Sequence, residues 1–393
     1  MDRRVNNIAQ FPTSTLQYKP MAKLPMPEPE SQDESTSDSA LTPLRRRIDE
    51  VDRDIVRLLN ERASVVVEIG QIKRDDKMPI YAPDRERRVF DQIRGYNQGP
   101  LPDACLEAIW REVMSGSFAL ERTLRIGFLG PPGSFSHLAS RDRFGACVEY
   151  HDLDSIRAVF DHVVRGQTDL GLVPIENSSH GGISETLDAF LDSSVKVCAE
   201  VLEPIHHNML ANCSADQVKR VYSKPEALNQ CQRWLGSKFH RAERVPTAST
   251  SKAAELASSE RDSAAIGSIL AAEIYGLKVL FSNVEDNPGN ATRFFVIGQY
   301  DSPSTDDDKT AVMFTTAHRA GALADMLDVF RDCGLNLTHI DKRPSRDVNW
   351  EYYFFVDFEG HRADPNVSKA LERAKRHCLR LNVLGSFPKA TPS

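Results

Sequence analysis

The sequence lacks the features of several large classes of protein. Its seven cysteines are never closer than fifteen residues apart, so neither a zinc cage nor a disulfide framework is indicated. No apolar run approaches the ~20 residues of a membrane span, and no apolar signal core follows Arg3 and Arg4. A net charge of -7 gives no basic excess for nucleic acid. We therefore expect a cytoplasmic protein in a reducing compartment, with no membrane and no nucleic acid as partner.

A length of 393 residues is too great for one hydrophobic core, so several domains are expected. Residues 1–41 are rich in Pro, Ser, Glu and Gln and predict a disordered N-terminal extension. A processed targeting segment is the alternative. Changes of periodicity then place domains at 42–123, 124–301 and 309–389, with an acidic linker from Ser302 to Asp308.

Residues 42–72 predict a long amphipathic helix. Thr42 and Pro43 are typical of an N-cap and a first helical position. Apolar residues then recur at steps of three and four, which marks one helix face. Arg62 and Lys73 lie on or beside this face, and because buried unpaired cations are costly, we expect them to meet anions. Snorkelling at the helix edge explains one such cation, whereas two favour a ligand. The apolar face carries Leu44, Ile48, Val51, Ile55, Leu58, Val65, Ile69 and Ile72.

Further helices are predicted from Asp84 to about Tyr96 and from Pro102 to about Glu121, with a break at 97–100. The three helices resemble the all-helical chorismate mutases. The resemblance rests on Leu44-Arg45, Ile48-Asp49, Asp52, Leu58-Leu59, Arg62, Lys73, Pro79-Ile80-Tyr81, Arg85-Glu86 and Ser117 to Glu121.

This resemblance implies a role for each matching residue. Arg62 and Lys73 match ligands of the substrate's carboxylate and ether oxygen, and Lys73 with Glu121 would donate to the oxygen that becomes negative. The other matches are Arg85, Glu86, Ser117 and Arg45. Glu86 would bind the substrate hydroxyl, and Arg45 would reach the site from another chain. Ala82 stands where some relatives have an Asp that contacts the substrate, so this contact is missing here.

Helix geometry supports a dimer independently. Arg45 and Lys73 are 28 residues apart, about 42 Å along one helix at ~1.5 Å per residue. One small substrate cannot touch both, but an antiparallel partner helix brings Arg45 of a second chain to the site. An apolar stripe of this length also needs a partner.

The central segment alternates strand and helix. Strands are predicted at 124–130, 148–150 and 170–175, and again at 195–201, 218–221, 244–245 and 264–266. This order favours a largely parallel sheet in two lobes, 124–200 plus 284–300 and 201–283, with a cleft between them. The third strand ends at Glu176, Asn177 and Ser178, just before a helix start at Ser184, where small anions bind. An ordinary turn, with each Ser or Thr as a cap, is the alternative.

Three separated motifs in this segment resemble the prephenate dehydratases, and their two-lobed fold is similar to that of periplasmic binding proteins. The motifs are 130–137, Val173 to Ser178 with Thr186-Leu187-Asp188, and Asn290 to Phe294. The resemblance implies catalysis by Thr292, Asn177 and Glu176, with Thr292 donating to the leaving hydroxyl. Arg293 either holds a substrate carboxylate or supports the fold. The other implied substrate contacts are Ser134, Ser136, Ser178, Ser223, Gln230, Thr250 and Ser251.

The last segment predicts elements at 310–316, 321–333, 335–343, 351–358, 366–378 and 380–387. This βαββαβ order is the ferredoxin-like arrangement, and its motifs resemble the amino-acid-binding ACT modules. The resemblance implies an allosteric phenylalanine site, although Lys342 stands where relatives have Ser, and a module kept only for dimer packing is the alternative. The implied effector residues are Gly321, Ala322, Leu323, Asn336, Leu337, Asp341 and Arg343.

We interpret the chain as multidomain: an all-α mutase domain, a two-lobed α/β dehydratase domain and an α+β ferredoxin-like ACT domain. The resemblances imply rearrangement of chorismate to prephenate, then conversion of prephenate to phenylpyruvate, with no cofactor and no metal, in a homodimer or higher homo-oligomer. A dehydratase with a non-catalytic helical dimerisation domain and a non-catalytic sensor of an aromatic acid are the alternatives. Prephenate and arogenate both stay open as the substrate of the central domain.

Overall fold

The computed structural model describes residues 36–76, 78–345 and 352–390. They divide into two compact units after Leu58. The prediction of disorder for residues 1–41 falls, up to residue 35, outside the described residues. Within the described ranges, no helix is both long and apolar enough to cross a membrane.

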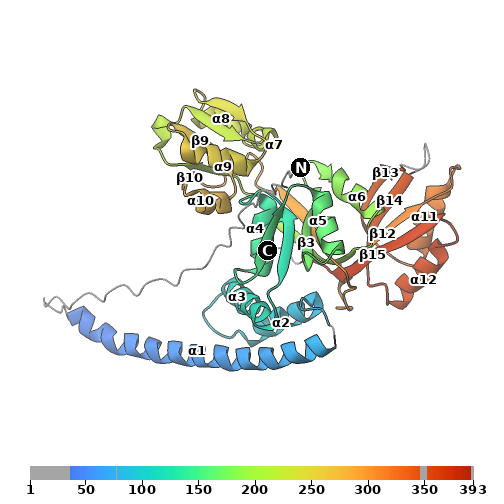
Figure 1. Cartoon of the computed structure of the whole chain (residues 1–393), viewed down its shortest axis with the longest axis horizontal. Coiled ribbons are helices and arrows are strands. Elements are labelled where there is room, and N and C mark those ends of the chain that lie inside the picture. The colour runs from blue at the N-terminus through green and yellow to red at the C-terminus, as the bar shows by residue number, and fades with distance from the viewer. Residues whose placement is uncertain (1–35, 77, 346–351, 391–393) are drawn as a thin grey trace, which may run out of the picture. The chain divides into compact units, whose positions relative to one another are not determined.

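Helix α1 (Thr36–Asp75) is one continuous helix (Figure 1). The prediction that it starts at Thr42 is wrong, because the helix begins six residues earlier and includes Pro43. Pro43 lacks a backbone N–H and therefore leaves one hydrogen bond of the helix unmade. Each residue of the predicted apolar face keeps 43–61% of its surface exposed in the single chain, which leaves the face uncovered.

Helices α2 (Pro83–Tyr96) and α3 (Asp103–Glu121) agree closely with the prediction. The loop before α2 carries Tyr81, which is 1% exposed. Its ring packs edge-on against Phe118 of α3 and Phe144, at centroid distances of 6.3 and 5.2 Å. Because Tyr81 also belongs to a core with Ile126 of the first sheet, the helices and that sheet share buried surface.

The first sheet has the order β2-β1-β3-β11-β5, with β4 beside β3. Strand β1 is parallel to β2 and β3, but β11 is antiparallel to both β3 and β5. The prediction of a largely parallel sheet is therefore wrong for this half, because β11 returns from the second sheet and enters in the opposite direction. We call this sheet, with α4 (Phe135–Phe144), α5 (Ile156–Val164) and α6 (Ser184–Leu191), the first lobe. Its strands are β1 (Arg125–Leu129), β2 (Glu149–Leu153), β3 (Leu170–Asn177), β4 (Gly181–Gly182), β5 (Lys196–Pro204) and β11 (Ala291–Gly298).

The second lobe is built on a sheet of order β10-β6-β9-β7-β8. Its strands β6 and β10 were not predicted. The lobes are tied by the loop before α4, where Ser268 Oγ donates to the Gly133 carbonyl oxygen at 2.7 Å. Gly133 has a φ of +83°, which favours glycine. The elements are β6 (Asn208–Ala211), η1 (Ala215–Gln217), β7 (Arg220–Ser223), α7 (Pro225–Gln230), α8 (Gln232–Lys238), β8 (Glu243–Pro246), α9 (Thr250–Ser259), β9 (Ser263–Gly267), α10 (Ile269–Tyr275) and β10 (Lys278–Phe281).

The C-terminal segment follows the predicted βαββαβ order, in a sheet of order β13-β14-β12-β15. We call it the tail. Phe387 of the tail packs against Phe295 of β11, with ring centroids 5.4 Å apart, so the tail and first lobe share a core. The elements are β12 (Asp308–Thr315), α11 (Ala322–Asp332), β13 (Leu337–Pro344), β14 (Tyr352–Glu359), α12 (Pro365–Ala374) and β15 (Arg380–Pro388).

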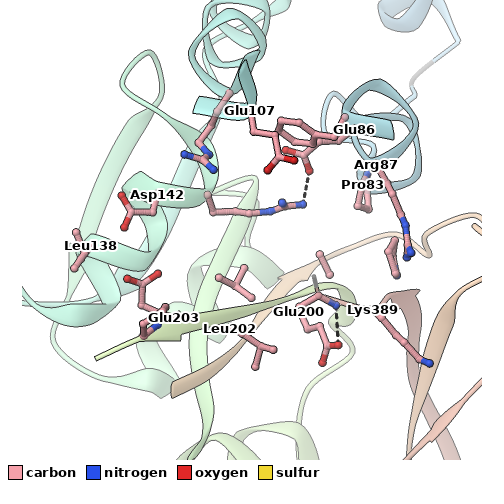
Figure 2. A pocket seen from close by; sticks show the side chains of 18 of the residues that line it. Pro83, Glu86, Arg87, Glu107, Leu138, Asp142, Glu200, Leu202, Glu203 and Lys389 are labelled. Carbon is pink, nitrogen blue, oxygen red and sulfur yellow. Dashed lines mark hydrogen bonds and ion pairs between the residues drawn. The ribbon is translucent and has the colours of Figure 1, made fainter. Parts of the chain in front are cut away.

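A cavity of about 880 Å³ lies among α2, α3, α4, β5 and the end of β15. Asp142 and Glu203 lie next to each other on its wall (Figure 2) and share a hydrogen bond, which requires a proton between the carboxyl groups. Burial, reinforced by the neighbouring Asp142 carboxyl, raises the pKa of Glu203 to about 8.

We predict that Glu203→Gln changes how stability depends on pH. The folded wild-type protein keeps a proton on Glu203 that the unfolded chain releases at its ordinary pKa of ~4.3. Between that pKa and about 8, the wild-type free energy of unfolding falls as pH rises, because unfolding releases a proton. Glutamine cannot ionise, so the free energy of unfolding of E203Q should rise relative to that of the wild type as pH rises. Denaturation midpoints at about pH 5 and about pH 9 measure this, with the exposed Glu226→Gln as control. An equal difference between E203Q and wild type at both pH values would contradict the prediction.

Candidate active sites

Four predicted residues meet where the end of α1 packs on α3. Arg62 Nη1 donates to Ser117 Oγ at 2.8 Å. Lys73 Nζ lies 3.0 Å from Glu121 Oε2 and also donates to the Ile80 carbonyl at 3.1 Å. The group combines two cations, a hydroxyl and a carboxylate on rigid helices, which suits the binding of a small dicarboxylate.

The predicted pair on α2 separates. Arg85 is exposed, and burial together with the charge of Arg85 lowers the pKa of Arg62. Glu86 points elsewhere: it is 7% exposed and pairs with Arg143 of α4 and the Tyr81 hydroxyl. In the single chain the Glu86 carboxylate is engaged by Arg143 and Tyr81, and its contact with the substrate hydroxyl stays a prediction. Neighbouring helical residues are about 100° apart, so Arg85 and Glu86 serve different faces of α2.

Asn177 and Thr292 face each other on neighbouring strands β3 and β11. The Asn177 Oδ1 accepts from the backbone N–H of Ser179 at 3.0 Å. A backbone N–H is only a donor, so the orientation of the Asn177 amide is fixed. Its Nδ2 therefore donates to Thr292 Oγ1 at 2.9 Å. Since Thr292 accepts this bond, its own hydroxyl hydrogen stays free to donate to a bound molecule.

A set of hydrogen bonds extends from this pair into the second lobe. Asn290 Oδ1 accepts from Asn177 Nδ2 at 3.1 Å, and Asn290 Nδ2 donates to Gln230 Oε1 at 3.4 Å. Gln230 Oε1 also accepts from His207 Nε2 at 2.7 Å. Ser178 joins through its hydroxyl, 3.3 Å from Asn290 Oδ1. We call these residues, with Thr292, the inter-lobe network. The predicted residues Asn177, Ser178, Gln230 and Thr292 thus come together.

Glu176 and Arg293 lie on the opposite face of the same strands. Arg293 is 8% exposed and pairs with Glu200 at 2.8 Å and with Asp357 of the tail at 2.7 Å. Glu176 lies 3.3 Å from His339 Nδ1, also in the tail. Glu176 and Asn177 face opposite sides of the sheet, because successive strand residues alternate, and a catalytic role of Glu176 stays a prediction. For Arg293, these ion pairs favour the alternative in which it supports the fold.

The remaining predicted serines have varied surroundings. Ser134 is the N-cap of α4, its Oγ accepting from His137 N at 3.2 Å, and Ser223 donates to the Ile266 carbonyl at 2.7 Å. These contacts fit the cap and turn alternative. Ser136 is 7% exposed. Thr250 and Ser251 begin α9, and the buried Ser251 Oγ has no hydrogen-bond partner among the described residues.

The predicted effector residues of the tail divide into two groups. Gly321, Ala322 and Leu323 form the start of α11, and Asn336 and Leu337 lie at the start of β13. Asp341 and Arg343 instead face the first lobe. Asp341 lies against Gly182, and Arg343 makes two bonds of 2.6 and 2.8 Å to Asp188 of α6. In the single chain these two residues make contacts between domains, and their place in an effector site stays a prediction.

His207 and the side chain of Asn290 were not predicted from the sequence. Asn290 stands two residues before Thr292 in the motif Asn290 to Phe294 and directly before β11, so its place in the motif offered a signal. His207 follows the end of β5 in the pair His206-His207, where polar residues after a strand signal a site. No local sequence pattern around Arg143 predicts its ion pair with Glu86. Arg45 belongs to the unit before Leu59 and stays a prediction.

Two family models match successive parts of the chain. Residues 44–122 match chorismate mutase type II, and residues 126–302 match prephenate dehydratase. A solved prephenate dehydratase from Arthrobacter aurescens, in complex with L-Phe, is 31% identical with a TM-score of 0.64, covering 69% of this chain and 92% of that one. The prephenate dehydratase from Staphylococcus aureus is 28% identical with a TM-score of 0.60, covering 67% and 100%.

Curated relatives span almost the whole chain. The bifunctional chorismate mutase/prephenate dehydratase of Stutzerimonas stutzeri is 40% identical over 357 residues, which is 89% of this chain and 98% of the relative. That of Aquifex aeolicus is 41% identical over 355 residues, with the same coverage. The chain belongs to the family of bifunctional chorismate mutase/prephenate dehydratases.

Proposed function

We propose that the helical residues Arg62, Lys73, Arg85, Ser117 and Glu121 carry the first reaction of this enzyme and the inter-lobe network the second. The enzyme rearranges chorismate to prephenate and converts prephenate to phenylpyruvate in phenylalanine biosynthesis. Incubation with chorismate tests both steps, since prephenate should appear first and phenylpyruvate later. Accumulating prephenate would contradict the second step. A parallel assay with arogenate tests the open choice of substrate.

The first reaction is a pericyclic rearrangement, so the protein must fold the substrate and stabilise charge at the ether oxygen. Arg62 and Arg85 are suited to hold carboxylates in the reactive conformer. Lys73 Nζ, held by Glu121 and the Ile80 carbonyl, is a fixed donor for the developing negative charge. The pairing of Lys73 and Glu121 is the observation that carries this proposal.

We further propose that the site is completed in a homodimer. The apolar face of α1 stays about half exposed in one chain, and a partner helix would cover it. Arg45 of the partner would then supply the remaining cation, as the resemblance implies.

We predict that Lys73→Ala lowers mutase kcat/KM by about 10²–10³-fold, the cost of losing a fixed donor to developing charge. Dehydratase turnover of added prephenate should persist, because Lys73 lies outside the inter-lobe network. Arg88→Ala removes an exposed cation paired with Asp84 and serves as control. Equal loss of both activities in folded K73A would contradict separate sites.

The second reaction needs help for hydroxide to leave as water, while aromatisation drives the loss of carbon dioxide. Thr292 accepts from Asn177, so its hydrogen is available for the leaving hydroxyl. A threonine hydroxyl is a weak acid; we therefore assign it as a hydrogen-bond donor or relay. The fixed amide of Asn177 is the observation that supports this role.

We predict that Asn177→Asp lowers dehydratase kcat by about tenfold or more with little change in KM. The carboxylate has the shape of the amide but only accepts, so Thr292 would turn its hydrogen toward residue 177 and away from the substrate. A bond made chiefly in the transition state acts on kcat. Steady-state kinetics with prephenate measure this, and mutase activity of the same protein is the control. Wild-type kcat in N177D would remove the Asn177–Thr292 bond from the mechanism.

We propose that the tail is an ACT domain through which phenylalanine inhibits the dehydratase. The Arthrobacter relative was solved in complex with L-Phe. The route is supported by strand order, because Thr292 is followed by Arg293, which is paired with Asp357 of the tail. A shift of the tail between two states would therefore act on the strand that carries Thr292.

We predict that phenylalanine binds wild type and Asp357→Asn alike in calorimetry, but that D357N loses about fivefold or more of the inhibition, within the usual range of allosteric coupling. Asp188→Asn is the matched control, because it removes the Arg343 pair between the same domains without touching β11. Equal inhibition of wild type and D357N would contradict this route. No binding to wild type would contradict feedback itself, and Lys342→Ser would then be the first variant to test.

A further inference from the structure

His207 lies in the connection between β5 and β6, where the chain passes from the first lobe to the second. It is 2% exposed. Its ring packs edge-on against Phe135 of α4 at 5.3 Å. Its backbone N–H donates to Glu285 and its carbonyl accepts from Val284, each at 2.8 Å. The backbone bonds fix the main chain at His207, and its ring contacts Phe135 of the first lobe and Gln230 of the second.

The hydrogen bonds of the inter-lobe network have one consistent direction, which fixes the tautomer of His207. The backbone N–H of Ser179 makes Asn177 Oδ1 an acceptor, so Asn177 Nδ2 donates to Asn290 Oδ1. Asn290 Nδ2 must then donate to Gln230 Oε1, which leaves His207 Nε2 as a donor to the same oxygen. His207 thus carries its hydrogen on Nε2.

The other nitrogen of the ring supports this assignment. His207 Nδ1 is buried without a hydrogen-bond partner among the described residues, and a buried N–H without an acceptor would be costly. Burial, opposed by Gln230 and Glu285, lowers the pKa of His207. The neutral ring with a bare Nδ1 is the form that fits this environment.

We propose that His207 is a positioning residue for the dehydratase reaction. Its Nε2–H holds Gln230 Oε1 of the second lobe beside Asn290 of the first lobe. Asn290 in turn holds Asn177, whose amide leaves the Thr292 hydrogen free. The hydrogen bonds that dock the second lobe on the first therefore also orient the Thr292 hydroxyl. The proposal rests on the role of Thr292 given above.

Gln230 gains a second use from this arrangement. Its carbonyl oxygen is taken by His207 and Asn290, and within the described residues its NH₂ group donates to no neighbour. A bound carboxylate or hydroxyl of the substrate is a suitable acceptor for that group. Loss of His207 would free the amide to rotate and would misplace both ends of Gln230.

Two substitutions at His207 separate the hydrogen bond from the packing. His207→Phe keeps a ring against Phe135 but has no donor, and we expect dehydratase kcat to fall about tenfold with KM nearly unchanged. His207→Gln places an amide nitrogen at a similar reach, so we expect it to recover kcat to within about threefold of wild type. Mutase activity of the same proteins reports correct folding. Wild-type kcat in H207F, or equal loss in H207F and H207Q, would overturn the proposal.

A double-mutant cycle with Gln230→Leu tests the route. If His207 acts through Gln230, His207→Phe should have little further effect on kcat in that background, whereas additive losses would overturn the proposal. If H207F does not fold, His207→Asn, whose amide is too short to reach Gln230, takes its place with the same outcomes. Thr292→Ala is measured in parallel, since a wild-type kcat there contradicts the proposed role of Thr292 rather than the link from His207 to Gln230.

Discussion

The antiparallel pairing of β3 with β11 is the constraint on which the dehydratase depends. Its register places Asn177 opposite Thr292 and Glu176 opposite Arg293. Because strand side chains alternate between faces, the pair Asn177 and Thr292 belongs to the inter-lobe network, whereas the pair Glu176 and Arg293 contacts the tail. A shift of one residue would exchange the two sets and bury a polar pair of the site against the tail. The same register therefore defines the site and its contact with the tail.

The first lobe also joins parts of the chain that have different tasks. One core contains Tyr81 of the helical segment with Ile126 and Phe294 of the sheet. A second core contains Phe295 of β11 with Met313 and Phe387 of the tail. Phe294 and Phe295 are adjacent on one strand, so β11 contributes to both cores on its two faces. Movement of the tail or of the helices consequently acts on the strand that carries Thr292.

Local patterns in the sequence predicted most of the helices and the residues that follow their periodicity. Arg62, Lys73, Ser117 and Glu121 were found because helical spacing and motifs both point to them. Strands β6, β10 and β11 were not predicted, and length alone does not explain this, because β7 and β8 also have four residues and lie at predicted strands. It was predictable that Glu176 and Asn177 face opposite sides of the sheet, because successive residues of a strand alternate between its two faces. The ion pair of Glu86 was not predictable, because its partner Arg143 stands 57 residues later in the chain.

The pair formed by Glu86 and Arg143 shows how the two enzymes constrain each other. Glu86 is nearly fully buried, and burial raises the pKa of its carboxyl although Arg143 opposes the rise. Removing one partner of such a pair costs more than the pair contributes, because the other is left as a buried charge. The face of α2 that holds Glu86 is thus bound to the first lobe. Arg85 lies on the same helix, so the contact of Glu86 with the first lobe also fixes the place of Arg85.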